Sequence, residues 1–229
     1  MTKPPARVPQ RSNARSNRER ILATARRELG RNPDITLEEL ARASGVVRRT
    51  LFGHFPGREA LLEALAEEAS EALRAALPAD PAPSGAGVES AERSYARFVL
   101  SMWTVGDRYR LLLALARRDL GVERVTEILS PARSAATTIL DRGQRDGVFH
   151  TQLPAAVLSA GLEAMSIALL EEVNSGELED DGTHAAVASL IAAGVPEKQA
   201  RVVVDEVAPG REVGPAGDVA SAGGAVADD

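Results

Sequence analysis

The sequence predicts an all-α protein with a small three-helix head at its amino-terminal end and a larger helical body behind it. Three observations predict this class. Apolar residues recur at helical spacing along most of the 229 residues. Two of the early helical segments are short and are separated by only a few residues around Gly45. No run of alternating apolar and polar residues indicates a strand.

Composition is that of an ordinary soluble globular chain, with 44% hydrophobic and 26% charged residues. Cysteine is absent, which excludes disulfides and cysteine-based zinc sites. His54, His150 and His184 do not have the spacing of metal ligands, so we expect neither a metal nor another cofactor. No signal peptide is recognisable, and no apolar run reaches the roughly 18 residues that span a bilayer. We therefore expect a cytoplasmic protein.

Charge is distributed unevenly along the chain. The formal net charge is −6, yet residues 1–62 hold 13 Lys and Arg against six Asp and Glu. The remaining residues hold 14 Lys and Arg against 27 Asp and Glu. A basic first quarter joined to an acidic body favours a segment that faces nucleic acid. The alternative is a solvated basic face without a partner.

Residues 1–15 contain three prolines and four cationic side chains with few large apolar residues, which predicts a flexible basic arm. Ser16 and Glu19 then have the spacing of a capping box, and a first helix is expected over about residues 17–31. Its apolar face carries Ile21, Leu22, Ala25 and Leu29.

A helix-turn-helix follows. Thr36 and Glu39 form a second capping box, which opens a helix over about residues 37–44. Gly45 ends that helix because glycine adopts positive φ at little cost, and the next helical pattern covers about residues 47–53. Leu51 and Phe55 share one side of it and are expected to pack inward. Residues 16–60 are therefore predicted to be a helix-turn-helix DNA-binding domain.

The rest of the chain reads as helices and one tail. Behind Gly57 a helix of about 20 residues is expected, and a proline-rich loop follows at residues 78–87. Further helical patterns cover about residues 88–104, 106–119, 121–129, 131–146, 154–175 and 184–208, the last with a break at residues 194–196. We assign residues 61–207 to one helical ligand-binding and dimerisation domain. Residues 208–229 are rich in Gly, Ala and Pro and acidic, which predicts a disordered tail.

Enzyme motifs are missing from the sequence. It contains no phosphate-binding G-x-x-x-x-G-K-[ST], no G-x-G-x-x-G after a strand, no H-E-x-x-H and no G-x-S-x-G. The densest carboxylates, at residues 171–172 and 179–181, are expected to be a solvated acidic helix end. We therefore expect a protein that is not an enzyme.

Two stretches of the head resemble a known family. Residues 36–46 read TLEELARASGV and residues 50–62 read TLFGHFPGREALL. Both are similar to the DNA-binding head of the tetracycline-repressor (TetR) family of transcriptional regulators. The resemblance covers about residues 17–65, and the helices behind it are similar to that family's body in length and pattern.

The resemblance implies specific DNA contacts. Phosphate contacts would fall to Thr36, His54 and Arg58, and base reading to Arg48, Arg49 and Thr50 with the backbone at Gly53. Two positions depart from the family's pattern. Val47 stands where a Ser or Thr commonly caps the third helix, and Phe52 where a Tyr commonly binds phosphate; Phe52 is expected either to touch DNA or to pack. The predicted DNA-binding residues are Thr36, Val47, Arg48, Arg49, Thr50, Phe52, Gly53, His54 and Arg58.

In the body, aromatic and apolar side chains gather on two successive helical patterns: Tyr95, Phe98, Met102, Trp103, Tyr109 and Leu113. From the residues alone such a stripe is a core feature more often than a pocket. The resemblance implies a pocket for a small effector, which would be mainly apolar, with polar contacts from Tyr95, Arg97 or Arg110.

Residues 154–170 are apolar nearly all round, and residues 185–193 are apolar and small. A helix without a polar face needs cover on more than one side, which favours a homodimer built from these two helices. Burial in a monomer core is the alternative. The predicted interface residues are Leu158, Gly161, Leu162, Met165, Leu169, Val187, Leu190 and Ile191.

Together these expectations describe a ligand-responsive transcriptional regulator, a repressor that binds a near-palindromic DNA operator as a homodimer. The alternative is a helical dimer that binds a small molecule or a protein and no longer reads DNA.

Overall fold

The computed structural model describes residues 9–81 and 87–208, which form nine α-helices and no strand within those ranges. The predicted all-α class is confirmed. The helices are α1 (Pro9–Arg31), α2 (Leu37–Ala43), α3 (Arg48–His54), α4 (Arg58–Ala76), α5 (Ala91–Asp119), α6 (Val122–Arg145), α7 (Ala155–Ser175), α8 (Thr183–Ala192) and α9 (Glu197–Val207).

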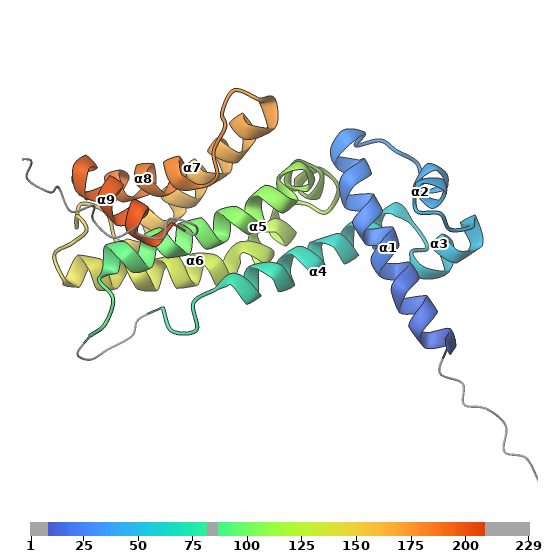
Figure 1. The fold of residues 1–229 in the computed structure, drawn as a ribbon, viewed down its shortest axis with the longest axis horizontal. Coiled ribbons are helices and arrows are strands. Elements are labelled where there is room, and N and C mark those ends of the chain that lie inside the picture. Colours follow the sequence, from blue (N-terminus) through green and yellow to red (C-terminus); the bar gives the residue numbers. More distant parts are fainter. Residues whose placement is uncertain (1–8, 82–86, 209–229) are drawn as a thin grey trace, which may run out of the picture.

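The head and the body lie at opposite ends of an elongated molecule (Figure 1). Helices α1 to α3 form the head, and α4 runs from it along the body. Helix α5 is the centre of the body, because it packs against α4, α6, α7, α8 and α9. It also contacts α1, so the body touches the head through more than the α4 connection.

Two clusters of buried side chains form the core. The body cluster joins α5, α6, α7, α8 and α9. The head cluster contains the predicted inner residues of α1 to α3, among them Ile21, Leu29 and Leu51, which are all fully buried. It also takes in Tyr109 and Leu112 from the second half of α5. The head core therefore depends on a helix that belongs to the body.

The expected start of the first helix was wrong. Helix α1 begins at Pro9, whereas the sequence favoured a flexible arm over residues 1–15; residues 1–8 lie outside the described part. Proline is well suited to the first turn of a helix because the amide there has no partner within the helix. An Arg15–Glu19 ion pair of 3.0 Å spans one turn of this segment. The segment has no apolar face, so hydrophobic periodicity could not detect it.

Two expected breaks are also absent. Helix α5 continues through Gly106, and α6 continues through Pro131. A Cβ atom at Gly106 would lie 2.9 Å from Leu170 Cδ1, so this glycine allows close approach of α7 and ends nothing. Proline inside a helix costs about 3 kcal/mol. Buried residues on both sides of Pro131, such as Ile128 and Ala135, hold the helix to the core and offset that cost.

The break expected at residues 194–196 is confirmed, because α8 ends at Ala192 and α9 begins at Glu197. The acidic stretch at 179–181 differs from the prediction at one position. Asp180 is fully buried and accepts the backbone N–H groups of Gly182, His184 and Ala185 at 2.9–3.0 Å. Its carboxylate caps the start of α8, as carboxylates at helix amino termini do. Of the predicted tail, only Ala208 is described.

Candidate nucleic-acid interface and cavity

The turn between α2 and α3 has the geometry that the sequence predicts. Thr36 caps α2: the Glu39 amide donates to Thr36 Oγ1 at 3.2 Å, and the Thr36 amide donates back to Glu39 Oε2 at 2.9 Å. This exchange holds the pKa of Glu39 below its ordinary value. Gly45 has φ 63°, a conformation that glycine adopts without strain. The chain therefore reverses within four residues and presents α3 across the end of α2.

Helix α3 has one buried side and one exposed side. Leu51 and the residue that follows the helix, Phe55, are buried in the head core. Val47, Arg48, Arg49 and Gly53 are exposed, whereas Thr50, Phe52 and His54 are half-buried. The predicted base-reading residues thus share the outer side and the first turn of a short helix, and that is the part of a recognition helix that reaches base edges.

Arg48 and Arg49 differ in their neighbours. The Arg48 guanidinium lies 3.0 Å from Glu38 of α2 and 5.1 Å from the centre of the Phe52 ring. Arg49 is exposed and forms no ion pair with a described residue. Arg49 is therefore free to meet an anion, whereas Arg48 must first leave a carboxylate.

The two departures from the family's pattern have different structural outcomes. Val47 occupies the cap position of α3 with 69% of its surface exposed, and no side chain caps the helix there. Phe52 is half-buried, packs against the head core and lies under Arg48. Packing thus accounts for Phe52, whereas Val47 has no structural role that these contacts reveal.

Arg58 lies away from the exposed side of α3 in its interactions. It donates to the carbonyl oxygens of Pro33 and Ile35 in the α1–α2 loop, and its Nε lies 3.2 Å from Asp119 at the end of α5. Arg118 and Arg58 both hold the pKa of Asp119 below its ordinary value, with Arg118 the larger cause. The phosphate contact expected of Arg58 therefore competes with three internal ones.

A cavity of about 200 Å³ lies in the body between α4, α5, α6 and α7. Its wall contains all six of the side chains predicted for a pocket: Tyr95, Phe98, Met102, Trp103, Tyr109 and Leu113. Leu62 and Leu73 of α4 complete the side that faces the head-bearing helix. The stripe of aromatic residues is therefore both core and cavity wall. Burial raises the pKa of the Tyr95 hydroxyl above its ordinary value.

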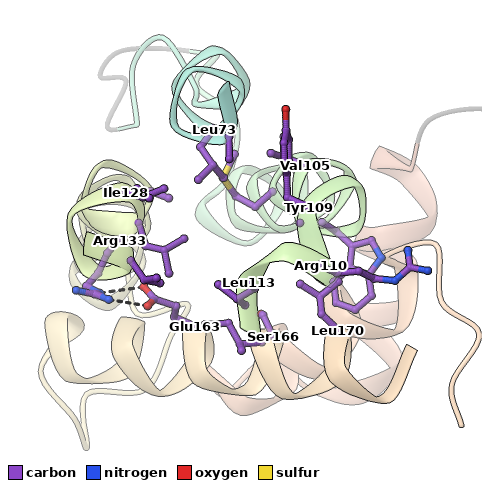
Figure 2. A pocket seen from close by; sticks show the side chains of 18 of the residues that line it. Leu73, Val105, Tyr109, Arg110, Leu113, Ile128, Arg133, Glu163, Ser166 and Leu170 are labelled. Atoms are coloured by element: carbon purple, nitrogen blue, oxygen red, sulfur yellow. Dashed lines mark hydrogen bonds and ion pairs between the residues drawn. The ribbon is translucent and has the colours of Figure 1, made fainter. Parts of the chain in front are cut away.

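The polar contacts of the cavity differ in part from those expected. Arg110 lines it, but Arg97 does not and pairs instead with Glu89 at 2.9 Å. Sequence reasoning missed the Arg133–Glu163 ion pair, which joins α6 to α7 in the cavity wall (Figure 2). These residues lie 30 positions apart, and no local pattern connects them.

Comparison with known families identifies the head. Residues 21–65 match the model of the bacterial regulatory proteins of the tetR family. The chain carries a tetR-family head. The match spans α1 from Ile21, the helix-turn-helix and the first half of α4, which are the elements that place Arg48 and Arg49 on the surface. A comparison with curated proteins found no match.

Solved structures extend the likeness from the tetR-family head to the body. A γ-butyrolactone receptor described as ArpA-like is 19% identical with a TM-score of 0.65, covering 85% of this chain and 97% of its own. LfrR of Mycobacterium smegmatis, solved with proflavine, is 24% identical at 0.60, covering 80% and 99%. FadR of Bacillus subtilis, solved with stearoyl-CoA, is 15% identical at 0.62, covering 77% and 97%. The whole chain therefore has a TetR-like fold.

The predicted dimer interface needs correction. Leu158, Leu162 and Leu190 are at most 4% exposed and belong to the chain's own core, so they offer no surface to a partner. They project inward because α7 and α8 each turn one apolar side toward α5 and α6. Met165, Leu169 and Val187 are half-buried against the same core. Of the predicted residues only Gly161 and Ile191 are exposed.

An exposed apolar surface nevertheless remains on α7 and α8. Val157 is 53% and Ile191 42% exposed, and the small residues Gly161, Ala164 and Ala168 follow Val157 at helical spacing. We call these five residues the α7–α8 face. In the described residues no helix is long and apolar enough to cross a membrane, and no group of three or more His, Asp or Glu is placed to hold a metal.

A further contact that the sequence did not reveal joins the cavity to the tetR-family head. The Tyr109 hydroxyl donates to Glu68 of α4 at 2.8 Å, and the same carboxylate pairs with Arg26 of α1. The Arg26 guanidinium also lies 5.5 Å from the centre of the Tyr109 ring. Burial, and then the bond to Glu68, raise the pKa of Tyr109 above its ordinary value. One cavity-lining residue thus contacts both helices that hold the head in place.

Proposed function

We propose that this protein is a transcriptional repressor that binds a near-palindromic DNA operator as a homodimer and releases it when a small, mainly apolar effector fills the cavity. The observation that carries the proposal is the exposed first turn of α3, where Arg48 and Arg49 stand outside a helix-turn-helix of the tetR family. Residues at that position of a recognition helix reach base edges in the major groove. Such a regulator works where the DNA is, in the cytoplasm.

Within this proposal the arginines divide the work. Arg49 binds guanine directly, because a guanidinium matches the O6 and N7 acceptors of that base in a bidentate manner. Arg48 leaves Glu38 when DNA approaches, and Thr36, Thr50 and His54 border the same surface. Arg58 positions the α1–α2 loop through its carbonyl contacts. The basic arm ahead of α1 adds phosphate contacts that strengthen with falling salt concentration.

The homodimer forms through the α7–α8 face. An apolar surface on the outside of a body helix costs free energy in water, and a second copy of the same surface removes it. Small residues at Gly161, Ala164 and Ala168 allow two helices to approach closely. A two-fold axis through this face would carry two heads, and the half-sites of the operator would then lie one or more helical turns apart, roughly 34–36 Å for each turn.

The effector acts through α4. This helix carries the head at one end and lines the cavity with Leu62, Leu65 and Leu73. A molecule that fills the cavity displaces these side chains, and so shifts the equilibrium between head positions that fit the operator and those that do not. Two proteins of this fold were solved with small organic molecules bound, which supports an effector for this chain.

DNA binding is tested by fluorescence anisotropy of a labelled mixed-sequence duplex over a series of salt concentrations. Replacing both arginines (Arg48→Ala with Arg49→Ala) removes two cations from the interface, and each lost phosphate contact makes the slope of log K against log salt shallower by about 0.9. Arg145→Ala is the matched control, since Arg145 is equally exposed but lies on α6 in the body. An unchanged slope in the double variant would exclude α3 as the DNA-contacting helix.

Dimerisation is tested by light scattering at micromolar concentration. Val157→Glu places a charge in the α7–α8 face and is expected to give monomers, because an unpaired charge is costly to bury between two apolar surfaces. Val202→Glu is the control: Val202 is 50% exposed but lies on α9, outside the face. A wild-type monomer, or a Val157→Glu variant that remains dimeric, would refute this interface.

A second candidate function is a helical dimer that binds a small molecule and no longer reads DNA. The uncapped Val47 and the position of Phe52 under Arg48 favour it, because neither residue offers a hydrogen bond to phosphate. The salt series separates the two functions, since this candidate predicts no salt-dependent binding at any ionic strength.

A further inference from the structure

One polar feature stands out in the wall of the cavity, the ion pair between Arg133 of α6 and Glu163 of α7. Arg133 Nε donates to Glu163 Oε2 at 2.9 Å and Arg133 Nη2 donates to Oε1 at 2.6 Å, which makes the pair bidentate. The side chains are 34% and 23% exposed. The bonds to Glu163 raise the pKa of the Arg133 guanidinium above its ordinary value, so the pair stays ionised. Its net charge is zero.

The other polar groups of the wall are already engaged. Arg110 lies on the opposite side of the cavity, where its guanidinium pairs with Asp107 and donates to Asn174 at 2.7 Å (Figure 2). The Tyr109 hydroxyl donates to Glu68. The hydroxyls of Ser159 and Ser166 donate to helix carbonyl oxygens at 3.4 Å and 2.9 Å.

This arrangement disfavours a charged ligand. A carboxylate would have to take Arg133 from Glu163 and leave a second carboxylate without its partner, and an ammonium group would do the same to Arg133. Removing one partner from a buried pair is strongly unfavourable because the remaining charge is then uncompensated. An uncharged hydroxyl meets no such penalty: it donates to a free lone pair of Glu163, and its oxygen accepts from a remaining N–H of Arg133.

We infer that the cavity binds an uncharged, mainly apolar molecule whose single hydrogen-bonding group is held by the Arg133–Glu163 pair. The inference rests on the proposed function in one respect, namely that the cavity is the effector site. It adds the charge class of the effector and the two residues that select it. Apolar side chains such as Phe98, Leu113 and Ile128 cover the rest of the molecule.

The test is isothermal titration calorimetry with three probes that share one chain and differ in charge at pH 7: octan-1-ol, octanoate and octylamine. The wild-type protein is expected to bind octan-1-ol at least about tenfold more tightly than either ion. Glu163→Gln leaves the Arg133 charge uncompensated, so octanoate becomes the tightest probe. Arg133→Met leaves the Glu163 charge uncompensated, so octylamine becomes the tightest.

Arg145→Met is the matched control, because it also removes a charge from α6 but breaks an exposed pair with Asp141 outside the cavity. Its ranking of probes should equal that of the wild type. Circular dichroism checks that each variant is folded, and should Arg133→Met fail to fold, the near-isosteric Glu163→Gln decides alone.

Each other result contradicts a particular claim. A wild-type preference for either ion overturns the inference, and an unchanged ranking in Glu163→Gln shows that the pair does not select the ligand. If none of the three probes binds, the cavity is not an effector site of this class, so the inference and the effector part of the proposed function both fail. DNA binding by the head is measured separately and is untouched by that result.

Discussion

Arg48, Arg49 and Arg58 belong to the same head, yet their guanidinium groups face three different environments. Arg49 is exposed, Arg48 is held between Glu38 and the Phe52 ring, and Arg58 ties the α1–α2 loop to the end of α5. Residue type and helical position predicted all three as DNA contacts. Their partners lie on other elements, and for that reason the sequence could not separate the free arginine from the engaged ones.

Phe52 offers a direct test of the interface at the residue scale. Phe52→Tyr keeps the ring that packs under Arg48 and adds a hydroxyl that can donate to a phosphate. We expect DNA affinity to rise by about fivefold, the equivalent of one hydrogen bond of about 1 kcal/mol. Anisotropy titration at fixed salt measures this. Equal or weaker binding would show that the ring does not approach the DNA backbone and serves packing alone.

The residues of the cavity illustrate what helical spacing reveals and what it does not. Tyr95, Phe98 and Trp103 were predicted from one helix, since residues on one face of a helix recur in the sequence. Arg133 and Glu163 come from two helices and meet only after the body has folded. Local pattern therefore predicts which side of a helix faces the cavity, whereas the polar pair that decides ligand charge is a tertiary contact.

At the scale of the elements, the helices were predicted well and their ends less well. Gly106 and Pro131 were expected to end helices because both residues weaken helical structure in isolation. Each lies instead inside a long helix that packs along most of its length, and packing outweighs the local preference. Gly45 and the residues 194–196 do end helices, because positive φ at Gly45 and Gly194 turns the chain there.

Gly143 in α6 provides a test of that packing. A Cβ atom there would lie 2.1 Å from Phe149 Cδ2 and 3.0 Å from Ala91 Cβ, so Gly143→Ala is expected to destabilise the fold by about 1–3 kcal/mol through overpacking. Gly53→Ala is the control, because a Cβ at Gly53 meets nothing within 4 Å. Thermal unfolding without DNA compares the two. Equal stability of both variants would mean that α6 does not pack closely against the loop that holds Phe149.

At the scale of the whole molecule, the head is not an independent unit, because its core includes Tyr109 and Leu112 of α5. The domain boundary expected near residue 60 describes the chain order and leaves out this shared core. The sequence could not reveal the sharing, since α5 lies some 30 residues beyond α4 and its apolar spacing is the same for both cores.

Tyr109 tests the connection between the two parts. Tyr109→Phe removes the donor to Glu68 and keeps the packing, so unfolding should become easier by about 1 kcal/mol, or roughly 2–4 °C in melting temperature. Tyr95→Phe is the control, since its hydroxyl makes no hydrogen bond with a described residue. Differential scanning calorimetry measures both. Identical shifts in the two variants would argue against the Tyr109–Glu68 contact.

The central claim is that the head reads a DNA sequence, and selection from a pool of random duplexes tests it most directly. The account predicts enrichment of a near-palindromic site by the wild-type protein. It also predicts loss of that enrichment when Arg48→Ala and Arg49→Ala are combined, but not in Arg145→Ala. Failure to enrich any sequence at low salt, or the same enriched site in the double variant, would contradict the claim.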